Sequence, residues 1–382
     1  MKKYIFKTLF IFSFIIFGII IGNYKIFPYS LVKKIFRSTI YDLIYNLDTN
    51  VDGRIWRQSW DSNIFYNEND CVYYEGNSFL TKKDNINQTP TLNSTYWDTT
   101  TIYGRWSIGI FQGESVFNFS DPINISNPVI SASDVTDCDA YFVADPFLFY
   151  TDSVKYLFFE VWNKASSHGD IAYAESKDFI NWSYKSIIID EKFHLSYPYI
   201  FSWKNENYMI PESNNDLSVR LYKAISFPDN WEYIGNLLSG YNYVDPSIFR
   251  YKNKWWMFVY TKNNQQNYLN LFYSDALIKG WTPHPKNPII RNDLSQSRPG
   301  GRVIIIDEKI YRIAQNGIPS YGTEVNAFEI IELSDTNYLE KKTIKNPIVK
   351  KGDSPWNSFG MHHVDAHFIN GKWVAAVDGR NN

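Results

Sequence analysis

The feature that most constrains the fold is a short apolar segment with an x-Pro pair that recurs along the chain. It occurs in full as ADPFLF from residue 144, SYPYIF from residue 196 and VDPSIF from residue 244. A weaker copy, SRPGGRV, begins at residue 297, and VDAHF, from residue 364, lacks the proline. The first four copies follow one another at roughly 50 residues, a period typical of propeller blades, and the last interval is longer. The chain is therefore expected to be a repeat protein.

Each copy is followed by the same succession of strand-like segments. A turn with Lys, Asn or Gly leads to a second apolar and aromatic run, as at Tyr156 to Trp162 and Trp255 to Thr261, and a third run follows. Three or four strands per repeat form one blade. Five copies predict an all-β, five-bladed propeller over residues 51–382. The segments 106–111 and 115–119 precede the first repeat, and we expect them to supply outer strands to the last blade and close the ring.

Length, net charge and cysteine content exclude some classes of function. A chain of 382 residues is long enough to bury a sizeable core. The formal net charge is −2, which gives no electrostatic argument for a nucleic-acid partner. Cys71 and Cys138 form no CxxC pair, so no metal site or cofactor is expected from them, and the count leaves free thiols and one disulfide both open.

The N-terminus predicts a membrane anchor. The run from Thr8 to Tyr24 is uncharged, rich in Phe, Ile and Leu, and preceded by lysines. It lacks a small-x-small cleavage site, which favours a retained anchor over residues 1–24 rather than a cleaved signal peptide. Residues 25–50 have the pattern of a juxtamembrane amphipathic helix or an ordinary helical stalk. We therefore expect a single-pass membrane protein, with basic residues on both sides of the span and the side of the globular domain undecided.

The repeat also predicts a site. The innermost strand of each blade lines the central channel, so equivalent first residues of these strands converge on one mouth. Those residues are Asp145, Tyr197, Asp245, Arg298 and Asp365. A single Asp-Pro pair is a good strand-entry turn. Three aspartates at one repeat position, in a strand environment that disfavours Asp, predict a polar functional pocket instead.

Other polar residues are expected near the same mouth. Glu212 ends the second strand of blade two, and His194 precedes the inner strand of that blade. His362 and His363 are neighbours in a strand and point to opposite faces, so they are not expected to ligate one ion together. The planar guanidinium groups of Arg298 and Arg302 suit bidentate recognition of a carboxylate or a phosphate, which favours an acidic sugar, a nucleotide sugar or a glycolipid head group.

Several unusual peptides carry a family resemblance. They are FVADPF from residue 142, HLSYP from 194, MIPES from 209, RLYKA from 220, RPGGR from 298, YRIAQ from 311 and HHVDA from 362. In this order, over roughly residues 104–379, the chain resembles the N-terminal domain of plant glucosamine inositolphosphorylceramide transferases. That domain is in turn similar to the five-bladed propellers of arabinanase and xylosidase-type glycoside hydrolases. The resemblance implies a propeller that handles carbohydrate.

The resemblance has two departures. In the similar hydrolases a base Asp opens blade one, a second Asp that tunes pKa opens blade three, and an acid Glu opens blade four. Asp145 and Asp245 match the first two roles, whereas blade four reads SRPG from residue 297, without a carboxylate. Glu212 is the best substitute acid. In the plant proteins the transferase domain follows this region, whereas this sequence ends at Asn382, so the transferase activity is not carried over with the resemblance.

The sequence thus predicts a membrane-anchored, carbohydrate-active protein that acts on a glycosidic bond or a sugar-phosphate in surface polysaccharide or glycolipid synthesis. The alternatives are a non-catalytic glycan-binding propeller that partners a separate glycosyltransferase, and a glycoside hydrolase of the arabinanase or xylosidase type. The predicted catalytic residues are Asp145, Asp245 and Glu212. The predicted substrate-binding residues are His194, Tyr197, Arg298, Arg302, Gln315, His363 and Asp365.

Overall fold

The computed structural model describes residues 50–381, apart from 52–53, 69, 75–76, 92–93, 100–104, 264–265 and 319. The chain divides into two compact units, Met1–Ile102 and Tyr103–Asn382. The sequence-based range of the propeller began at residue 51. In the structure the strands between residues 50 and 99 belong instead to the first unit.

The first unit contains a small sheet with the strand order β1-β2-β4-β5-β7. Its strands are β1 (Asn50–Val51), β2 (Arg54–Ser59), β4 (Asp70–Tyr74), β5 (Asn77–Thr81) and β7 (Trp97–Thr99), and a separate pair is formed by β3 (Phe65–Tyr66) and β6 (Asn85–Ile86). Strands β2 and β4 are parallel. The buried side chains of Tyr66, Val72, Phe79 and Trp97 form its core.

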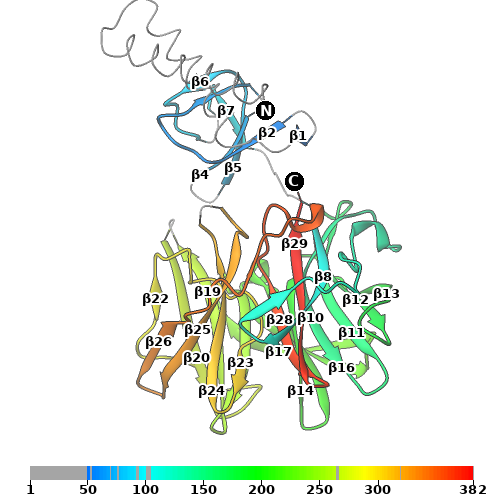
Figure 1. Cartoon of the computed structure of the whole chain (residues 1–382). Coiled ribbons are helices and arrows are strands. Elements are labelled where there is room, and N and C mark those ends of the chain that lie inside the picture. Colours follow the sequence, from blue (N-terminus) through cyan, green and yellow to red (C-terminus); the bar gives the residue numbers. More distant parts are fainter. Residues whose placement is uncertain are drawn as a thin grey trace, which may run out of the picture. The chain divides into compact units, whose positions relative to one another are not determined.

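The second unit consists of five sheets, which are the blades of a propeller (Figure 1). Blade one contains β10 (Ala140–Tyr150), β11 (Lys155–Asn163), β12 (His168–Ser176) and β13 (Trp182–Ile189). Blade two contains β14 (Ser196–Trp203), β15 (Glu206–Ser213), β16 (Ser218–Ser226) and β17 (Asn230–Ser239). Blade three contains β18 (Val244–Tyr251), β19 (Lys254–Asn263), β20 (Gln266–Ser274), β21 (Thr282–Pro283) and β22 (Ile290–Arg291). Blade four contains β23 (Ile304–Ile306), β24 (Lys309–Asn316), β25 (Glu324–Leu333), β26 (Tyr338–Lys342) and β27 (Val349–Lys350).

The fifth blade joins the two ends of the propeller segment. Its order is β28-β29-β8-β9, with β28 (Val364–Ile369) and β29 (Lys372–Arg380) from the end of the chain, and β8 (Trp106–Ser115) and β9 (Asn118–Ser120) from before blade one. Strand β29 pairs with β8 from Trp373 opposite Gly113 to Arg380 opposite Trp106. The predicted closure by residues 106–119 is therefore present. The all-β propeller predicted from the repeat is confirmed.

The x-Pro pairs lie at bulges in the inner strands. In β10, β14 and β18 the ladder register shifts at the x-Pro pair, and the residue before proline is left-handed: φ is 52° at Asp145, 48° at Tyr197 and 49° at Asp245. A left-handed residue other than glycine costs roughly 1–2 kcal/mol. Residues before proline also prefer extended backbone. The same strained conformation therefore recurs at the same place in three blades, and strained backbone of this kind is often found at functional sites.

The fourth and fifth repeats differ from the first three. Residues 298–302 precede β23, and the N–H of Val364 donates to the carbonyl of Gly300 at 2.8 Å, so this loop pairs with the start of β28. Strand β28 itself runs in unbroken register, with Asp365 opposite Ala376. Asp365 is therefore not at a bulge equivalent to that of Asp145.

The prediction of a single-pass membrane protein is corrected. Across the described residues the secondary structure is strands and three short 3-10 helices, and no helix there is long and apolar enough to cross a bilayer. The predicted span, Thr8 to Tyr24, and almost all of the predicted juxtamembrane helix at residues 25–50 lie outside the described residues.

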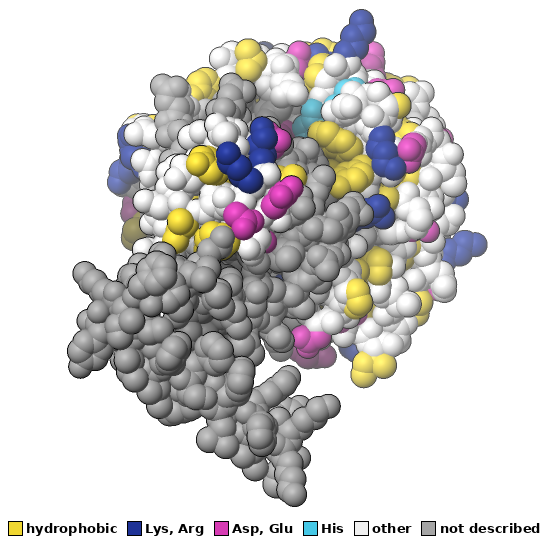
Figure 2. Space-filling view, turned by 90° about the horizontal axis from the view of Figure 1, so that it is seen from above, with side chains coloured by type: hydrophobic (Ala, Val, Ile, Leu, Met, Phe, Trp, Pro, Cys, Tyr) yellow, Lys and Arg dark blue, Asp and Glu magenta, His cyan; other side chains and the backbone are white. Residues whose placement is uncertain are grey.

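On the face in Figure 2, Lys and Arg side chains are interspersed with Asp and Glu, in keeping with the small net charge.

Candidate functional site

Asp145 is a buried carboxyl with one free oxygen. It lies at the bulge of β10, and its side chain is almost fully buried. Its Oδ1 accepts no hydrogen bond within the described residues and lies 3.6 Å from Nε2 of His362. Burial raises the pKa of Asp145 to about 7; His362 opposes this shift, and the nearby carboxylates of Asp245 and Asp378 add to it. A carboxyl with a pKa near neutrality can both accept and donate a proton at neutral pH.

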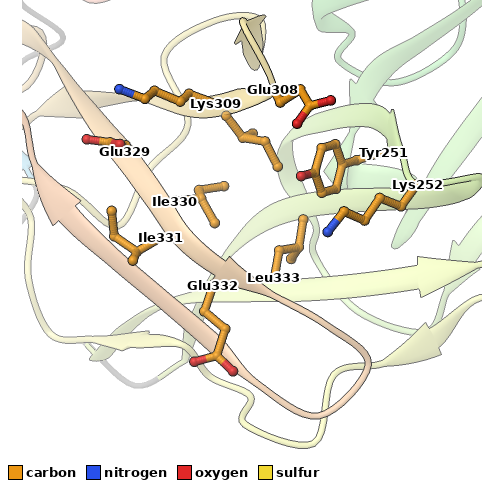
Figure 3. A pocket seen from close by; sticks show the side chains of 10 residues that line it. Tyr251, Lys252, Glu308, Lys309, Glu329, Ile330, Ile331, Glu332 and Leu333 are labelled. Carbon is orange, nitrogen blue, oxygen red and sulfur yellow. The ribbon is translucent and has the colours of Figure 1, made fainter.

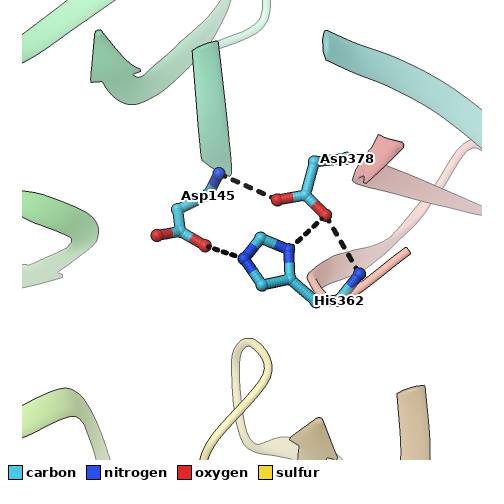
Figure 4. Close-up of side chains that lie close together, drawn as sticks. All are labelled: Asp145, His362 and Asp378. Atoms are coloured by element: carbon cyan, nitrogen blue, oxygen red, sulfur yellow. Dashed lines mark hydrogen bonds and ion pairs between the residues drawn. The ribbon is translucent and has the colours of Figure 1, made fainter. Parts of the chain in front are cut away.

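A buried histidine faces Asp145 and is oriented by a second aspartate (Figure 4). Nδ1 of His362 lies 2.8 Å from Oδ1 of Asp378, which also accepts the backbone N–H of His362 at 3.2 Å. The His362 ring stacks on Trp106, with centroids 4.0 Å apart. Although burial opposes it, the two aspartates raise the pKa of His362 above its ordinary value. Asp378, His362 and Asp145 thus form a chain of groups that can carry a proton.

Asp245 is engaged by its neighbours. Arg298 donates from Nε to Oδ2 of Asp245 at 2.5 Å and from Nη2 to Oδ1 at 3.3 Å, which is a bidentate pair. Gln315 adds a 3.0 Å hydrogen bond from Nε2 to Oδ2. The structure therefore brings three predicted site residues together. The guanidinium fork that was expected to face a ligand anion is directed at Asp245, and 29% of the Arg298 side chain remains exposed.

Two more buried carboxyls come from the second strands of blades one and two. Glu160 of β11 lies opposite Ala144, and Glu212 of β15 lies opposite Ser196, next to the bulges. Oε2 of Glu212 accepts the backbone N–H of Asp245 at 3.1 Å. Burial, with the surrounding carboxylates, raises the pKa of both Glu160 and Glu212 well above the ordinary value, so the protonated form is favoured.

Next to these groups, buried aromatic side chains of the inner strands pack on one another and form an aromatic layer. The hydroxyl of Tyr197 accepts the N–H of Gly301 at 2.7 Å and lies 2.8 Å from Oγ of Ser247. His363 is fully buried and packs edge-on against Phe147 and Tyr197, and burial lowers its pKa to about 4. Nδ1 of His363 lies 3.7 Å from Oδ1 of Asp145. The hydroxyl of Tyr197, which was predicted to bind substrate, thus forms its hydrogen bonds within the protein. Neutral His363 lies next to the carboxyl of Asp145.

Arg302 and Asp365 form a separate ion pair deeper in the channel. Nε of Arg302 donates to Oδ1 of Asp365 at 2.6 Å, and Nη2 donates to the carbonyl of Ile200 at 2.9 Å. Oδ2 of Asp365 also accepts the N–H of Leu148, three residues beyond Asp145 on β10. Both predicted residues therefore contact the inner strands past the aromatic layer rather than joining the group around Asp145.

His194 lies at the edge of the group. Its Nδ1 accepts the N–H of Gly169 at 2.9 Å, which leaves Nε2 to carry the proton, 3.9 Å from Oε1 of Glu160. Burial lowers the pKa of His194 to about 4, so the ring is neutral. The side chain is 21% exposed and packs near Trp162. It is placed to donate a hydrogen bond near the solvent-facing rim.

The charges of the site are balanced. Asp245 pairs with Arg298, and Asp378 pairs with His362. The three remaining carboxyls all have raised pKa values and favour the neutral form: Asp145, Glu160 and Glu212. Such a site offers many hydrogen-bonding groups with little net charge. The ligand atoms of Asp145, His362 and Asp378 also lie within 4.8 Å of one another, close enough to hold one cation.

A cavity of about 360 Å³ lies elsewhere, along blades three and four (Figure 3). It is lined by Tyr251, Lys252, residues 308–310 and residues 329–333. Its charged side chains are of both signs, and it contains none of the predicted site residues. The convergent polar groups lie around Asp145 instead.

Comparison with known proteins identifies the family. A sequence model described as glucosamine inositolphosphorylceramide transferase 1, N-terminal, matches residues 99–380. The chain belongs to this family. The resemblance seen in the peptides from residue 142 to residue 366 is confirmed.

Curated members of the glucosamine inositolphosphorylceramide transferase family align with most of this chain. The chain is 34% identical over 298 residues to glucosamine inositolphosphorylceramide transferase 1 of Oryza sativa subsp. japonica, with 72% of this chain and 40% of the relative covered. It is 33% identical over 301 residues to the protein of the same name from Arabidopsis thaliana, covering 72% and 39%. The chain therefore spans about two fifths of the length of these relatives.

Solved structures share the propeller fold of this family member at low identity. A putative glycosidase from Bacteroides thetaiotaomicron superimposes with a TM-score of 0.54 at 15% identity, covering 70% of this chain and 97% of that one. The β-1,2-mannobiose phosphorylase from Listeria innocua superimposes with a TM-score of 0.51 at 14% identity, covering 71% and 96%. These likenesses support the fold of the family domain.

Sequence reasoning missed several groups of the site. Asp378 lies in β29, Glu160 in β11 and Trp106 at the start of β8, none of them in an x-Pro segment. Tyr321 was missed too; its ring packs edge-on against His362 and lies 5.1 Å from the Arg298 guanidinium. The available signal was an acidic residue near the end of a blade's second strand, as in Glu160, Glu212 and Asp378.

Proposed function

We propose that this propeller binds a sugar at the mouth lined by Asp145 and assists a proton transfer at a glycosidic or sugar-phosphate bond. One observation carries the proposal. The carboxyl of Asp145 has a pKa near 7, and its buried Oδ1, which accepts no hydrogen bond within the described residues, faces a histidine that Asp378 orients. Perturbed carboxyls beside an oriented histidine are typical of catalytic sites.

The division of labour follows from the contacts. Asp145 removes a proton from a water or an acceptor hydroxyl, and the His362–Asp378 pair stabilises the charge that Asp145 gains or loses. Glu212 is the proposed acid, because its raised pKa keeps a proton available. Asp245 holds Arg298 and adjusts the electrostatic potential, which is a supporting role. A positioned acid or base contributes typically ~10²–10⁴-fold to a rate.

The ligand we propose is rich in hydroxyls and has little charge where it meets this site. Sugar and cyclitol hydroxyls donate to carboxyls and accept from His194 Nε2 and the outer edge of Arg298. The forks of Arg298 and Arg302 are already paired with Asp245 and Asp365, so a phosphate would have to compete with those carboxylates. A phosphate in the substrate is therefore proposed to lie outside the first contacts of Asp145.

The biological setting comes from the relatives' names. Since they are transferases that act with glucosamine and inositolphosphorylceramide by name, we propose a role in the synthesis or modification of a glycolipid or a surface polysaccharide. The chain spans only about two fifths of those proteins, so the activity of the whole relatives remains part of this proposal.

A second candidate is a non-catalytic glycan-binding propeller that works with a separate glycosyltransferase. Blade four places Arg298 where the similar hydrolases place an acid, and Asp245 is fully engaged by Arg298 and Gln315. This observation favours binding over hydrolysis, and makes a hydrolase of the arabinanase or xylosidase type the weaker form of the enzyme proposal.

The test compares turnover and binding in one pair of proteins. The wild-type chain and Asp145→Asn are titrated calorimetrically with glucosamine, myo-inositol and myo-inositol phosphate, and assayed on a panel of aryl glycosides and glycosyl phosphates. We expect binding to survive in Asp145→Asn and turnover to fall by ~10²–10⁴-fold. Binding without turnover in the wild type would select the binding module. Equal turnover in both proteins would remove Asp145 from the chemistry.

A further inference from the structure

A second group of potential ligands lies on blade one and shares no residue with the group around Asp145. His168 and Asp170 are two residues apart at the start of β12, so their side chains leave the same face of the strand. Asp190 directly follows β13, whose last residue Ile189 pairs with Ile171 of β12. This register brings Asp190 beside Asp170. The ligand atoms of the three residues lie within 4.8 Å of one another.

Asp170 is the buried member of the group and is incompletely satisfied. Its side chain is fully buried, and Oδ2 accepts a 3.1 Å hydrogen bond from Nδ2 of Asn163. Oδ1 accepts no hydrogen bond within the described residues. An ionised carboxylate in such surroundings is costly without a positive partner.

The other two members leave a route from solvent. The His168 side chain is 17% exposed, and Asp190 is exposed. Nδ1 of His168 lies 3.3 Å from Oδ1 of Asp170. Within the described part of the chain, neither Asp170 nor Asp190 forms an ion pair with a lysine or arginine. A cation that enters from the Asp190 side would therefore meet two carboxylates without a competing basic side chain.

We propose that His168, Asp170 and Asp190 bind one divalent transition-metal ion, of the class of Zn²⁺ or Mn²⁺. Imidazole nitrogen with carboxylate oxygens is a ligand set that suits these ions. Bonds of about 2.0–2.2 Å around such an ion place neighbouring ligand atoms roughly 3–3.5 Å apart. The 3.3 Å between His168 and Asp170 fits that spacing. Water completes the coordination on the exposed side.

The ion would fix the segment that carries His194. Gly169, between two of the ligands, donates its N–H to Nδ1 of His194 at 2.9 Å and accepts the N–H of Leu195 at 2.9 Å. Asp190 stands at the other end of the same connection between β13 and β14. A cation bound to Asp190 and to both neighbours of Gly169 therefore holds this connection at both ends. The inference concerns metal binding and does not depend on the function proposed for Asp145.

The test titrates the full chain with metal. The protein is freed of metal with a chelator and titrated calorimetrically with ZnCl₂, MnCl₂ and CaCl₂, alongside Asp190→Asn and the control Asp335→Asn. Asp335 pairs with Lys254 on another blade, so its loss removes the same charge away from the group. We expect one equivalent of Zn²⁺ or Mn²⁺ to bind the wild type and the control, and the affinity of Asp190→Asn to fall at least tenfold.

A second readout separates metal binding from misfolding. Bound metal should raise the unfolding temperature of the wild type and of Asp335→Asn, but not that of Asp190→Asn, since only a ligand of the native state stabilises it. Because Asp190 is exposed, this variant is expected to fold, and His168→Gln repeats the test from another ligand. Less than one equivalent of bound metal, equal affinity in Asp190→Asn, or a preference for Ca²⁺ would overturn the proposal.

Discussion

The backbone N–H of Asp145 donates a 3.0 Å hydrogen bond to Oδ2 of Asp378, which lies 233 residues further along the chain. Glu212 accepts the N–H of Asp245 in the same way at 3.1 Å. In both cases a carboxylate from the second strand of one blade binds the left-handed residue of the next blade. The strained bulges are therefore stabilised between blades, and the carboxyls that could do chemistry also hold the ring together.

The stability of the protein should depend on the ionisation of Asp145. Its pKa is raised from 3.8 to about 7 in the folded state. Between these values the unfolded chain releases the proton and the folded protein keeps it, so stability falls as pH rises from about 4 to about 7 and then levels off. Asp145→Asn removes this dependence. The difference in free energy of unfolding between Asp145→Asn and the wild type should therefore shift in favour of the variant by more than about 1 kcal/mol between pH 4 and pH 7.

Urea unfolding at pH 4.5 and pH 7.5 measures this change. Asp152→Asn is the matched control, because Asp152 is exposed on the same blade and should follow the wild type at both pH values. Parallel behaviour of Asp145→Asn and the wild type would show that the carboxyl is not neutral in the folded protein.

Asp378 should set the ionisation of His362. In Asp378→Asn an oxygen remains to accept the N–H groups, but the negative charge beside the imidazole is gone. Burial then dominates, and the pKa of His362 should fall. Histidine-selective NMR titration measures it. His284, whose Nε2 lies 3.0 Å from the carbonyl of Ser334, serves as the internal control and should not shift. If the pKa of His362 were the same in Asp378→Asn and in the wild type, the proposed role of Asp378 in orienting His362 would be excluded.

Replacing Arg298 by Lys should lower the stability of the folded protein. A lysine keeps the charge but loses the planar fork that binds both oxygens of Asp245. Hydrogen bonds to charged groups are worth about 1.5–3 kcal/mol each, so we expect a loss of stability on the order of 1–2 kcal/mol after partial replacement by the ammonium. Urea denaturation checks it. Arg291→Lys, at an exposed position, should change stability by less than about 0.5 kcal/mol; equal effects would contradict the bidentate pair.

Gly301 should tolerate no side chain. Its φ is 142°, and a Cβ built there would lie 1.8 Å from the carbonyl oxygen of Val364, where the blade-four loop pairs with β28. Gly301→Ala should destabilise the protein by about 3 kcal/mol or prevent folding. Gly371 also has a positive φ, 82°, but nothing lies within 4 Å of its Cβ, so Gly371→Ala should cost only about 1 kcal/mol. Similar losses of thermal stability in both variants would contradict the close approach.

Much of the fold could be predicted because the repeat is local. The x-Pro segments, the strand runs after them and the outer strands at residues 106–119 are each visible within a few residues, and a recurring blade leaves a propeller as the natural arrangement. The boundary between the two units at residue 102 could not be predicted from the sequence, because segments with a strand-like pattern occur on both sides of it. The predicted membrane span was not supported in the described residues.

Of the candidate site, the sequence identified the residues of the x-Pro segments and Glu212, but it missed Asp378 and Glu160 and did not reveal which groups pair. The repeat placed Asp145 and Asp245 at equivalent positions of the inner strands. The structure shows that both positions are bulges and brings Arg298 and Gln315 to Asp245. The sequence could not reveal that Arg302 and Asp365 pair with each other, because the weak fourth and fifth copies lack the bulge that the first three copies share.

The sequence by itself determined the strand-rich repeat, the number of repeats and the position of the x-Pro residues within them, since these depend on local patterning with a period that the chain displays. Only the tertiary structure decided which of those residues hold charge. Asp378, His362 and Asp145 meet because ring closure joins the last blade to the first, and burial there shifts their pKa values. Burial and long-range pairing are properties of the closed ring and cannot be read from any one segment.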